Sequence, residues 1–204
     1  MNSKIERIIN NFKARNIEAL YFNSFVEVKR EILKRISTSS LIGIGNSKTL
    51  KKMNISKELY ERDNKVFDKT LARSKSESKL LKKKSLLTDW YLTGTNAISM
   101  EGHIVNIDHS GNRVAAMLYG PERVIVVVGK NKITESLEEA IYRAKNVAAP
   151  LNAKRAGYNP PCVELDNCID CISEERVCNS LVVIEGQSNN NRLSVFIADE
   201  KSGF

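Results

Sequence analysis

The chain has 204 residues, of which 42% are hydrophobic and 27% charged, as in an ordinary globular domain. No apolar run approaches the ~20 residues of a membrane span, and the lysine-rich amino-terminal segment lacks the apolar core of a signal peptide. We therefore expect a cytoplasmic protein with no membrane partner. The formal net charge of +8 indicates either a small anionic ligand or a solvated lysine-rich surface. No nucleic-acid-binding module is recognisable, so nucleic acid is the least favoured partner.

The first elements alternate between helix and strand. Apolar residues recur at helical spacing over Ser3–Ala14 and again from Phe25 to Ile36, where Ser24 is the predicted N-cap. Short apolar runs at Ile17–Phe22 and Ser40–Gly43 predict strands. This alternation predicts an α/β protein with a helix-covered, mainly parallel sheet.

The remaining elements are expected to form one domain over residues 1–204, with a cysteine-rich insertion at about 160–179. Residues 52–75 read as a loop with short helical pieces, followed by a helix over Lys75–Thr88. A further helix begins at Ser136 and ends or bends at Pro150. Short apolar runs predict strands and, at the end, a closing hairpin: Ala97–Ile98, His103–Ile107, Val114–Tyr119, Val124–Val128, and the hairpin pair Leu181–Ile184 and Leu193–Ala198.

A glycine-containing turn lies between the second strand and the next helix. It reads Gly43-Ile44-Gly45-Asn46-Ser47-Lys48-Thr49. Glycines in such a turn let backbone N–H groups approach an anion. The segment matches neither the dinucleotide fingerprint nor a Walker loop. It is therefore either an anion-binding loop or a plain strand-to-helix turn.

Polar residues gather at the turns of the stretch from Thr93 to Lys132. Strand alternation places Asn106 and Asp108 on one face, and Arg113 follows five residues later. A carboxylate that accepts from hydroxyls beside a guanidinium that binds an anion would suit a polyol or a carboxylate. Turn formation alone is the alternative explanation. The candidate binding residues of this stretch are Asn96, Asn106, Asp108, Asn112 and Arg113.

All four cysteines fall within residues 162–178, with the spacing Cys162-x5-Cys168-x2-Cys171-x6-Cys178. Disulfides are disfavoured in a reducing cytosol, so the clustering predicts metal ligation. Four thiolates suit either a tetrahedral Zn²⁺ or an iron–sulfur cluster. The alternatives are a redox-active Cys168/Cys171 pair and ordinary cysteines that stabilise a loop.

Six segments taken together resemble the LUD domain family, which includes the lactate-utilisation protein C group. They follow one another in order along nearly the whole chain: Gly43–Leu50, Leu92–Ile98, Gly102–Asp108, Gly111–Ala116, Gly120–Lys132 and Ala149-Pro150. The cysteine segment resembles that of the short, stand-alone branch of the family.

The resemblance implies a fold similar to the NagB/ribose-5-phosphate isomerase/CoA-transferase group. It also implies that the glycine turn receives a phosphate or carboxylate, which makes Gly43, Gly45, Asn46, Ser47 and Thr49 candidate ligand-binding residues. Family members are linked to oxidation of lactate to pyruvate within iron–sulfur protein assemblies. We expect a protein that binds a small anionic metabolite, a hydroxy acid or phosphosugar, in oxidoreductase-linked metabolism. The alternative is a non-catalytic accessory subunit with a structural metal site, so the sequence leaves open whether the protein is an enzyme.

Overall fold

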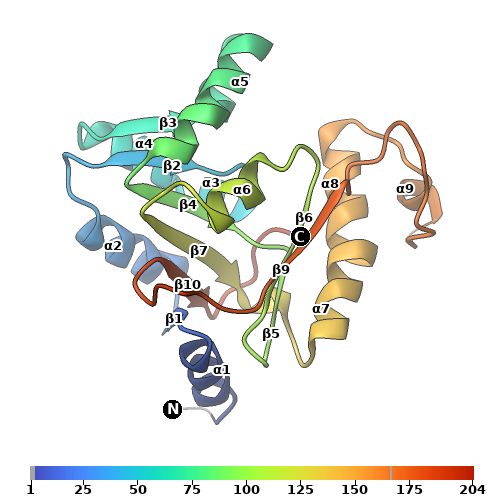
Figure 1. Ribbon diagram of the computed structural model, residues 1–204, viewed down its shortest axis with the longest axis horizontal. Helices are drawn as coiled ribbons and strands as arrows, with labels where there is room; N and C mark the ends of the chain where they lie inside the picture. The colour runs from blue at the N-terminus through green and yellow to red at the C-terminus, as the bar shows by residue number, and fades with distance from the viewer. Residues whose placement is uncertain (1–2, 166) are drawn as a thin grey trace.

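A computed structural model describes residues 3–165 and 167–204 and contains two sheets (Figure 1). The larger sheet has six strands in the order β1-β10-β7-β4-β2-β3, and every neighbouring pair in it is parallel. Its strands, in that spatial order, are Glu18–Phe22, Leu193–Ala198, Arg123–Gly129, Trp90–Gly94, Leu41–Ile44 and Lys65–Asp68. The prediction of a helix-covered parallel α/β sheet is confirmed.

Helices cover both faces of this sheet because its central strands are apolar on both sides. In β7, Val124, Val126 and Val128 pack into one core, whereas Ile125 and Val127 pack into the other. Helices α1 (Ser3–Ala14) and α6 (Asn112–Leu118) cover the first face. The second face is covered by α2 (Phe25–Arg35), α3 (Lys48–Met53) and α4 (Ile55–Glu61). Ser24 caps α2 by accepting from the Glu27 amide, so the predicted cap is confirmed.

The smaller sheet has the order β8-β5-β6-β9 and packs against a long helical segment (Figure 1). That segment consists of α7 (Leu137–Arg143), a π-helical turn (Ala144–Ala148) and α8 (Ala149–Ala156). Pro150 has no N–H to donate to a carbonyl one turn back, which accounts for the irregular turn just before it. The strands, in spatial order, are Ile133–Thr134, Ala97–Ser99, Ile104–Asp108 and Ser180–Ile184.

The remaining helices lie at the edges of the molecule (Figure 1). Helix α5 (Lys75–Lys84) has no buried residue and packs beside β3, and α9 (Cys162–Leu165) begins the cysteine segment. Three 3₁₀ turns complete the regular structure: Lys69–Leu71, Ser85–Leu87 and Lys130–Lys132. None of the described helices is both long and apolar enough to cross a membrane.

Three element predictions are wrong. Of residues 114–119, predicted as a strand, 114–118 belong to helix α6, in which Val114, Ala116 and Met117 are buried along one side. Residues 65–68, placed in a loop, form edge strand β3. The two closing strands form no hairpin, because β9 joins the small sheet while β10 inserts between β1 and β7.

Candidate functional site

The loops that follow β2, β4 and β7 meet at one end of the large sheet. The chain leaves β2 toward β3 on one side, and leaves β4 toward β7 on the other. Loops that leave adjacent parallel strands in opposite directions open a crevice at the carboxyl ends of those strands, the usual ligand position in open α/β sheets. The polar segments 45–47, 95–96 and 130–132 lie at these ends, and residues 199–204 follow β10 at the same edge.

A cavity of about 550 Å³ occupies this crevice, and we call it the cationic cavity. Asp108 has the one carboxylate side chain among the described lining residues. The cationic lining residues come from loops and helices far apart in the sequence: Lys48, Lys51, Lys69, Lys82, Arg113, Lys132 and Arg155.

Arg113 is held in place by protein acceptors on all sides of its guanidinium. Nη1 donates to Gly94 O at 3.0 Å and to Asn106 Oδ1. Nη2 donates to Ile107 O at 2.7 Å and to Asn96 Oδ1 at 3.2 Å. Nε lies 3.6 Å from Asp108 Oδ2. Four of the five N–H donors of the guanidinium are therefore used by protein acceptors, and Nε faces Asp108 in an ion pair without a hydrogen bond. Arg113 thus supplies positive charge to the cavity and positions its neighbours, and its two Nη atoms are committed to these protein acceptors.

Asp108 and Asn96 keep polar atoms for a ligand. Asp108 Oδ2 accepts from Val114 N at 3.2 Å, whereas Oδ1 has no protein partner in the described part of the chain. Asn96 Oδ1 accepts from Ile107 N at 2.9 Å, and its Nδ2 has no partner among the described residues. A carboxylate oxygen and an amide N–H on one wall suit hydroxyl groups of a ligand.

Lysines of the cavity lie in a positive potential. Burial, together with the charges of Lys82, Arg113 and Arg155, lowers the pKa of Lys69, and only Asp108 acts in the opposite direction. Lys132 is 5% exposed, and Nζ donates to Thr95 O at 2.9 Å. Burial, followed by the charges of Arg143 and Arg113, lowers its pKa to about 7. An anion in the cavity would relieve this repulsion.

The glycine turn contributes polar residues to the cationic cavity rather than its glycines. Asn46 and Ser47 line the cationic cavity, and Gly45 lines a neighbouring hollow of about 520 Å³. A Cβ on Gly43 would lie 2.8 Å from Tyr91 Cδ2, and one on Gly45 would lie 2.7 Å from Thr93 Oγ1. Both glycines therefore serve close packing of β2 against its neighbours. Helix α3 has only six residues, too few for a strong dipole at its start.

Of the predicted ligand-binding residues, six line the cavity: Asn46, Ser47, Asn96, Asp108, Asn112 and Arg113. Thr49 and Asn106 are fully buried and, like Gly43 and Gly45, do not line it. Prediction missed the lysines, above all Lys132. The available signal was the position of Lys132 just after a fully apolar strand, at the edge where the other strand-end loops gather.

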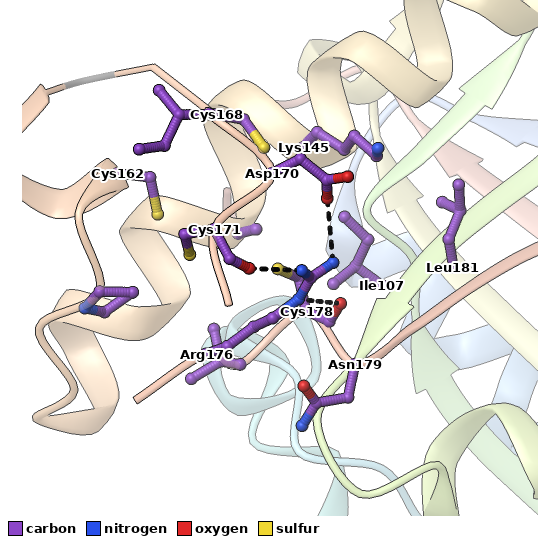
Figure 2. Close-up of a pocket in the computed structure, with 14 residues that line it drawn as sticks. Ile107, Lys145, Cys162, Cys168, Asp170, Cys171, Arg176, Cys178, Asn179 and Leu181 are labelled. Carbon is purple, nitrogen blue, oxygen red and sulfur yellow. Dashed lines mark hydrogen bonds and ion pairs between the residues drawn. The ribbon is translucent and has the colours of Figure 1, made fainter. Parts of the chain in front are cut away.

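The four cysteines line a second, smaller cavity of about 130 Å³, which we call the cysteine cavity (Figure 2). Cys162 is buried on α9, and the other three lie on irregular chain. The Arg176 guanidinium donates to the backbone carbonyls of Cys171 and Cys178 (Figure 2). Asn146, in the π-helical turn, accepts from Cys168 N at 2.9 Å. The Arg176 contacts hold the segment together, and the Asn146 contact attaches it to the π-helical turn.

Burial and neighbouring thiols raise the pKa values of two of the cysteines. Burial raises the pKa of Cys162, and the other three cysteines raise it further. Burial also raises the pKa of Cys178, with Arg176 acting against it. Within residues 3–165 and 167–204, however, no three His, Cys, Asp or Glu side chains are grouped as a metal site requires. Four cysteine thiols are the right kind and number of ligands for Zn²⁺ or an iron–sulfur cluster. In this structure, however, the four sulfur atoms are not brought together around one point.

Comparison with known proteins identifies one family. The model of the LUD domain matches residues 5–198. A crystal structure of a DUF162 family protein from Deinococcus radiodurans matches with a TM-score of 0.57 and 16% identity, covering 96% of each chain. At that identity the likeness shows the fold alone. No curated protein matches.

Proposed function

The chain belongs to the LUD domain family, and we propose that it binds a small anionic metabolite, a hydroxy acid or phosphosugar, in the cationic cavity. The observation that carries this proposal is the lining of the cavity, in which lysine and arginine side chains outnumber the single described carboxylate side chain. The volume of the cationic cavity lies within the range of small-molecule binding sites. The family includes lactate-utilisation proteins, which is consistent with a hydroxy acid.

Different residues would bind the two ends of such a ligand. Lys69 and Lys82 line the cavity and have no hydrogen-bond partner among the described side chains, so they are available to a carboxylate or phosphate. Asp108 Oδ1 would accept from a hydroxyl, and Asn96 Nδ2 would donate to one. Arg113 would hold both of these residues in place through its contacts with Asp108 Oδ2 and Asn96 Oδ1.

Calorimetry and thermal shift with lactate, ribose 5-phosphate and neutral glycerol test the proposal. Lys82→Ala is expected to weaken binding of the anions about tenfold, equivalent to ~1.4 kcal/mol. Lys83→Ala is the matched control, because Lys83 lies on the same helix, is exposed and does not line the cavity. Affinity should also fall as salt is added. The proposal fails if neither anion binds, or if the two variants weaken binding equally.

A second candidate function rests on the cysteine cavity. We propose that the four thiols bind Zn²⁺ or an iron–sulfur cluster, as in an accessory subunit of an oxidoreductase assembly. The support is that all four cysteines line one small cavity and are free thiols. Such thiols persist in a reducing compartment, which supports the proposal that the protein is cytoplasmic. With all four positions filled by cysteine, a zinc ion would be structural rather than catalytic.

Elemental analysis and a visible spectrum of protein purified anaerobically test this second proposal. Iron with sulfide and a brown colour would support a cluster. One zinc per colourless chain would support a structural ion. Protein that contains neither and binds no added zinc would rule out both. Cys168→Ser is expected to abolish stoichiometric binding, while Ile172→Ser, a change at a 97% exposed residue of the same segment, should leave it intact.

A further inference from the structure

Lys132 occupies an unusual position for a lysine. It ends the 3₁₀ turn that joins β7 to β8, and its side chain is buried against the segment after β10. A Cβ built on Gly203 would lie 3.0 Å from Lys132 Nζ, which is also in contact with the carbonyl of Thr95. The side chain nevertheless lines the cationic cavity. A ligand in that cavity would therefore meet an amine that is shielded from bulk water.

The surroundings of Lys132 favour a neutral amine. An ammonium group needs three acceptors, and Nζ has one, Thr95 O, among the described residues. The charged groups that act on it are the guanidiniums of Arg143, from α7, and Arg113, from α6. Burial next to other cations is one way in which proteins activate a lysine as a nucleophile. At neutral pH a substantial fraction of the amine is thus unprotonated, since its pKa is lowered to about 7.

A buried hydroxyl lies near the same point. The position that a Cβ on Gly203 would take is 3.2 Å from Thr49 Oγ1. Thr49 is fully buried, and Oγ1 has no hydrogen-bond partner in the described part of the chain. A buried polar group without a partner is costly. Thr49 does not line the cavity, so its hydroxyl would act from behind the amine, as a hydrogen-bond partner on the side of Gly203.

We propose that Lys132 is a nucleophile that forms an imine with a small ligand carrying both a carbonyl carbon and a carboxylate or phosphate. This inference rests on the proposed function, because the anionic group would be held by the cationic cavity. The nitrogen lone pair attacks the carbonyl carbon, a C–N bond forms, and the carbonyl oxygen takes up a proton to give a carbinolamine. Loss of that hydroxyl with a proton as water leaves the C=N bond. Nothing is oxidised or reduced.

Reductive trapping tests the proposal. The full-length protein is incubated with pyruvate or with ribose 5-phosphate, borohydride is added, and intact mass and peptide maps are recorded. We expect one adduct per chain, on Lys132, which adds the mass of the probe less one oxygen atom, because water is lost and two hydrogens are gained on reduction. The probe that reacts distinguishes an oxo acid from a sugar phosphate. Adduct yield should rise through about pH 7.

Three variants sharpen the test. Lys132→Met should lose the adduct, at least about tenfold below the unmodified chain, while it still melts cooperatively. Lys130→Met is the matched control, because Lys130 is two residues away, exposed, and paired with Asp199 at 2.8 Å. Thr49→Val should slow trapping several-fold without loss of affinity for lactate, which cannot form an imine.

Each outcome is decisive. An adduct on Lys132 that Lys130→Met retains supports the inference. Lactate or phosphosugar binding without any adduct, or with adducts spread over surface lysines, overturns the inference and leaves the anion site standing. Absence of both binding and adduct overturns the inference together with the proposed function.

Discussion

The cationic cavity and the cysteine cavity share part of a wall but are built in different ways. Ile107 and Val177 line both. The cationic cavity is bounded by the ends of parallel strands, and Arg113 ties its polar residues together. The cysteine cavity is bounded largely by irregular chain that Arg176 and Asn146 hold through a few hydrogen bonds. Its polar groups are therefore set in place far less firmly before any ligand binds.

This difference shows which kind of site has its geometry fixed before a ligand binds. A site on strand ends inherits its geometry from the hydrophobic core, so the folded chain already has it. A site on irregular chain takes its geometry from its own contacts, and a bound metal ion would add the strongest of them. The following experiments either remove a contact that holds one of the two cavities in shape or measure the coupling between the cavities.

The largest expected effect comes from removing the centre of the polar network. Arg113→Ala would leave Asp108 without its ion pair and the carbonyls of Gly94 and Ile107 without this donor. Because the two side chains are 15% and 11% exposed, the loss should stay below the ~3–5 kcal/mol of a fully buried pair, at about 2–3 kcal/mol. Urea unfolding measures the loss. Arg155→Ala, at an exposed position on the same cavity, should cost under ~0.5 kcal/mol. Equal losses in the two variants would show that the network is not structural.

The next effect depends on pH and concerns Lys132. Its pKa is lowered from 10.5 to about 7 by folding, so between these values the unfolded chain binds more protons. Stability attributable to this group therefore rises as pH increases from about 7 toward 10.5. Relative to Lys132→Met, the unmodified chain should gain about 2 kcal/mol between pH 7 and pH 9. Parallel stability curves for the two proteins would contradict a neutral buried amine.

A smaller, local effect is expected in the cysteine segment. If zinc binds there, Cys168→Ser should speed amide exchange over residues 167–179 about tenfold, equivalent to ~1.4 kcal/mol, and leave the parallel sheet unchanged. Exchange measured by mass spectrometry with and without zinc chloride shows this. Ile172→Ser serves as the control. Faster exchange throughout the parallel sheet would instead show that Cys168 stabilises the whole fold and not only the cysteine segment.

The smallest effect is coupling between the two cavities. Val177 is 3% exposed and lines both, so rearrangement of the cysteine segment would shift one wall of the cationic cavity. We expect chelation of a bound metal to change anion affinity about two- to fivefold, less than ~1 kcal/mol. Calorimetry with ribose 5-phosphate before and after chelation measures this change in affinity. Unchanged affinity would make the two regions independent.

Much of the fold could be predicted because local signals agree with the final structure. Ser24 and the apolar spacing after it predict helix α2, and the valines of 124–128 predict a central strand. Residues 114–118 were wrongly predicted as a strand, because a short apolar run can form either a strand or a short helix. The deciding feature is Gly111, whose φ of 72° starts the helix. The partners of β10 depend on distant pairing that no local pattern encodes.

The site was predictable only in part for a similar reason. Asp108 and Ser47 were found because strand-end and turn positions are visible in the sequence. Whether Arg113 has free donors depends on five acceptors brought together by folding. Lys132 was overlooked because the chain has 32 lysines and arginines, and a position just after an apolar strand marks a strand end without showing that folding buries the side chain.

Strand β10 has a consequence for how the protein is made. Among the described strands, β1 pairs only with β10, and Glu18 accepts a hydrogen bond from Ser194, 176 residues later. At roughly 5–20 residues per second on the ribosome, the first strand waits on the order of ten seconds or more for its partner. During that interval its unsatisfied edge is open to other nascent chains. Chaperone protection during synthesis should therefore matter more for this protein than for one whose neighbouring strands pair in order.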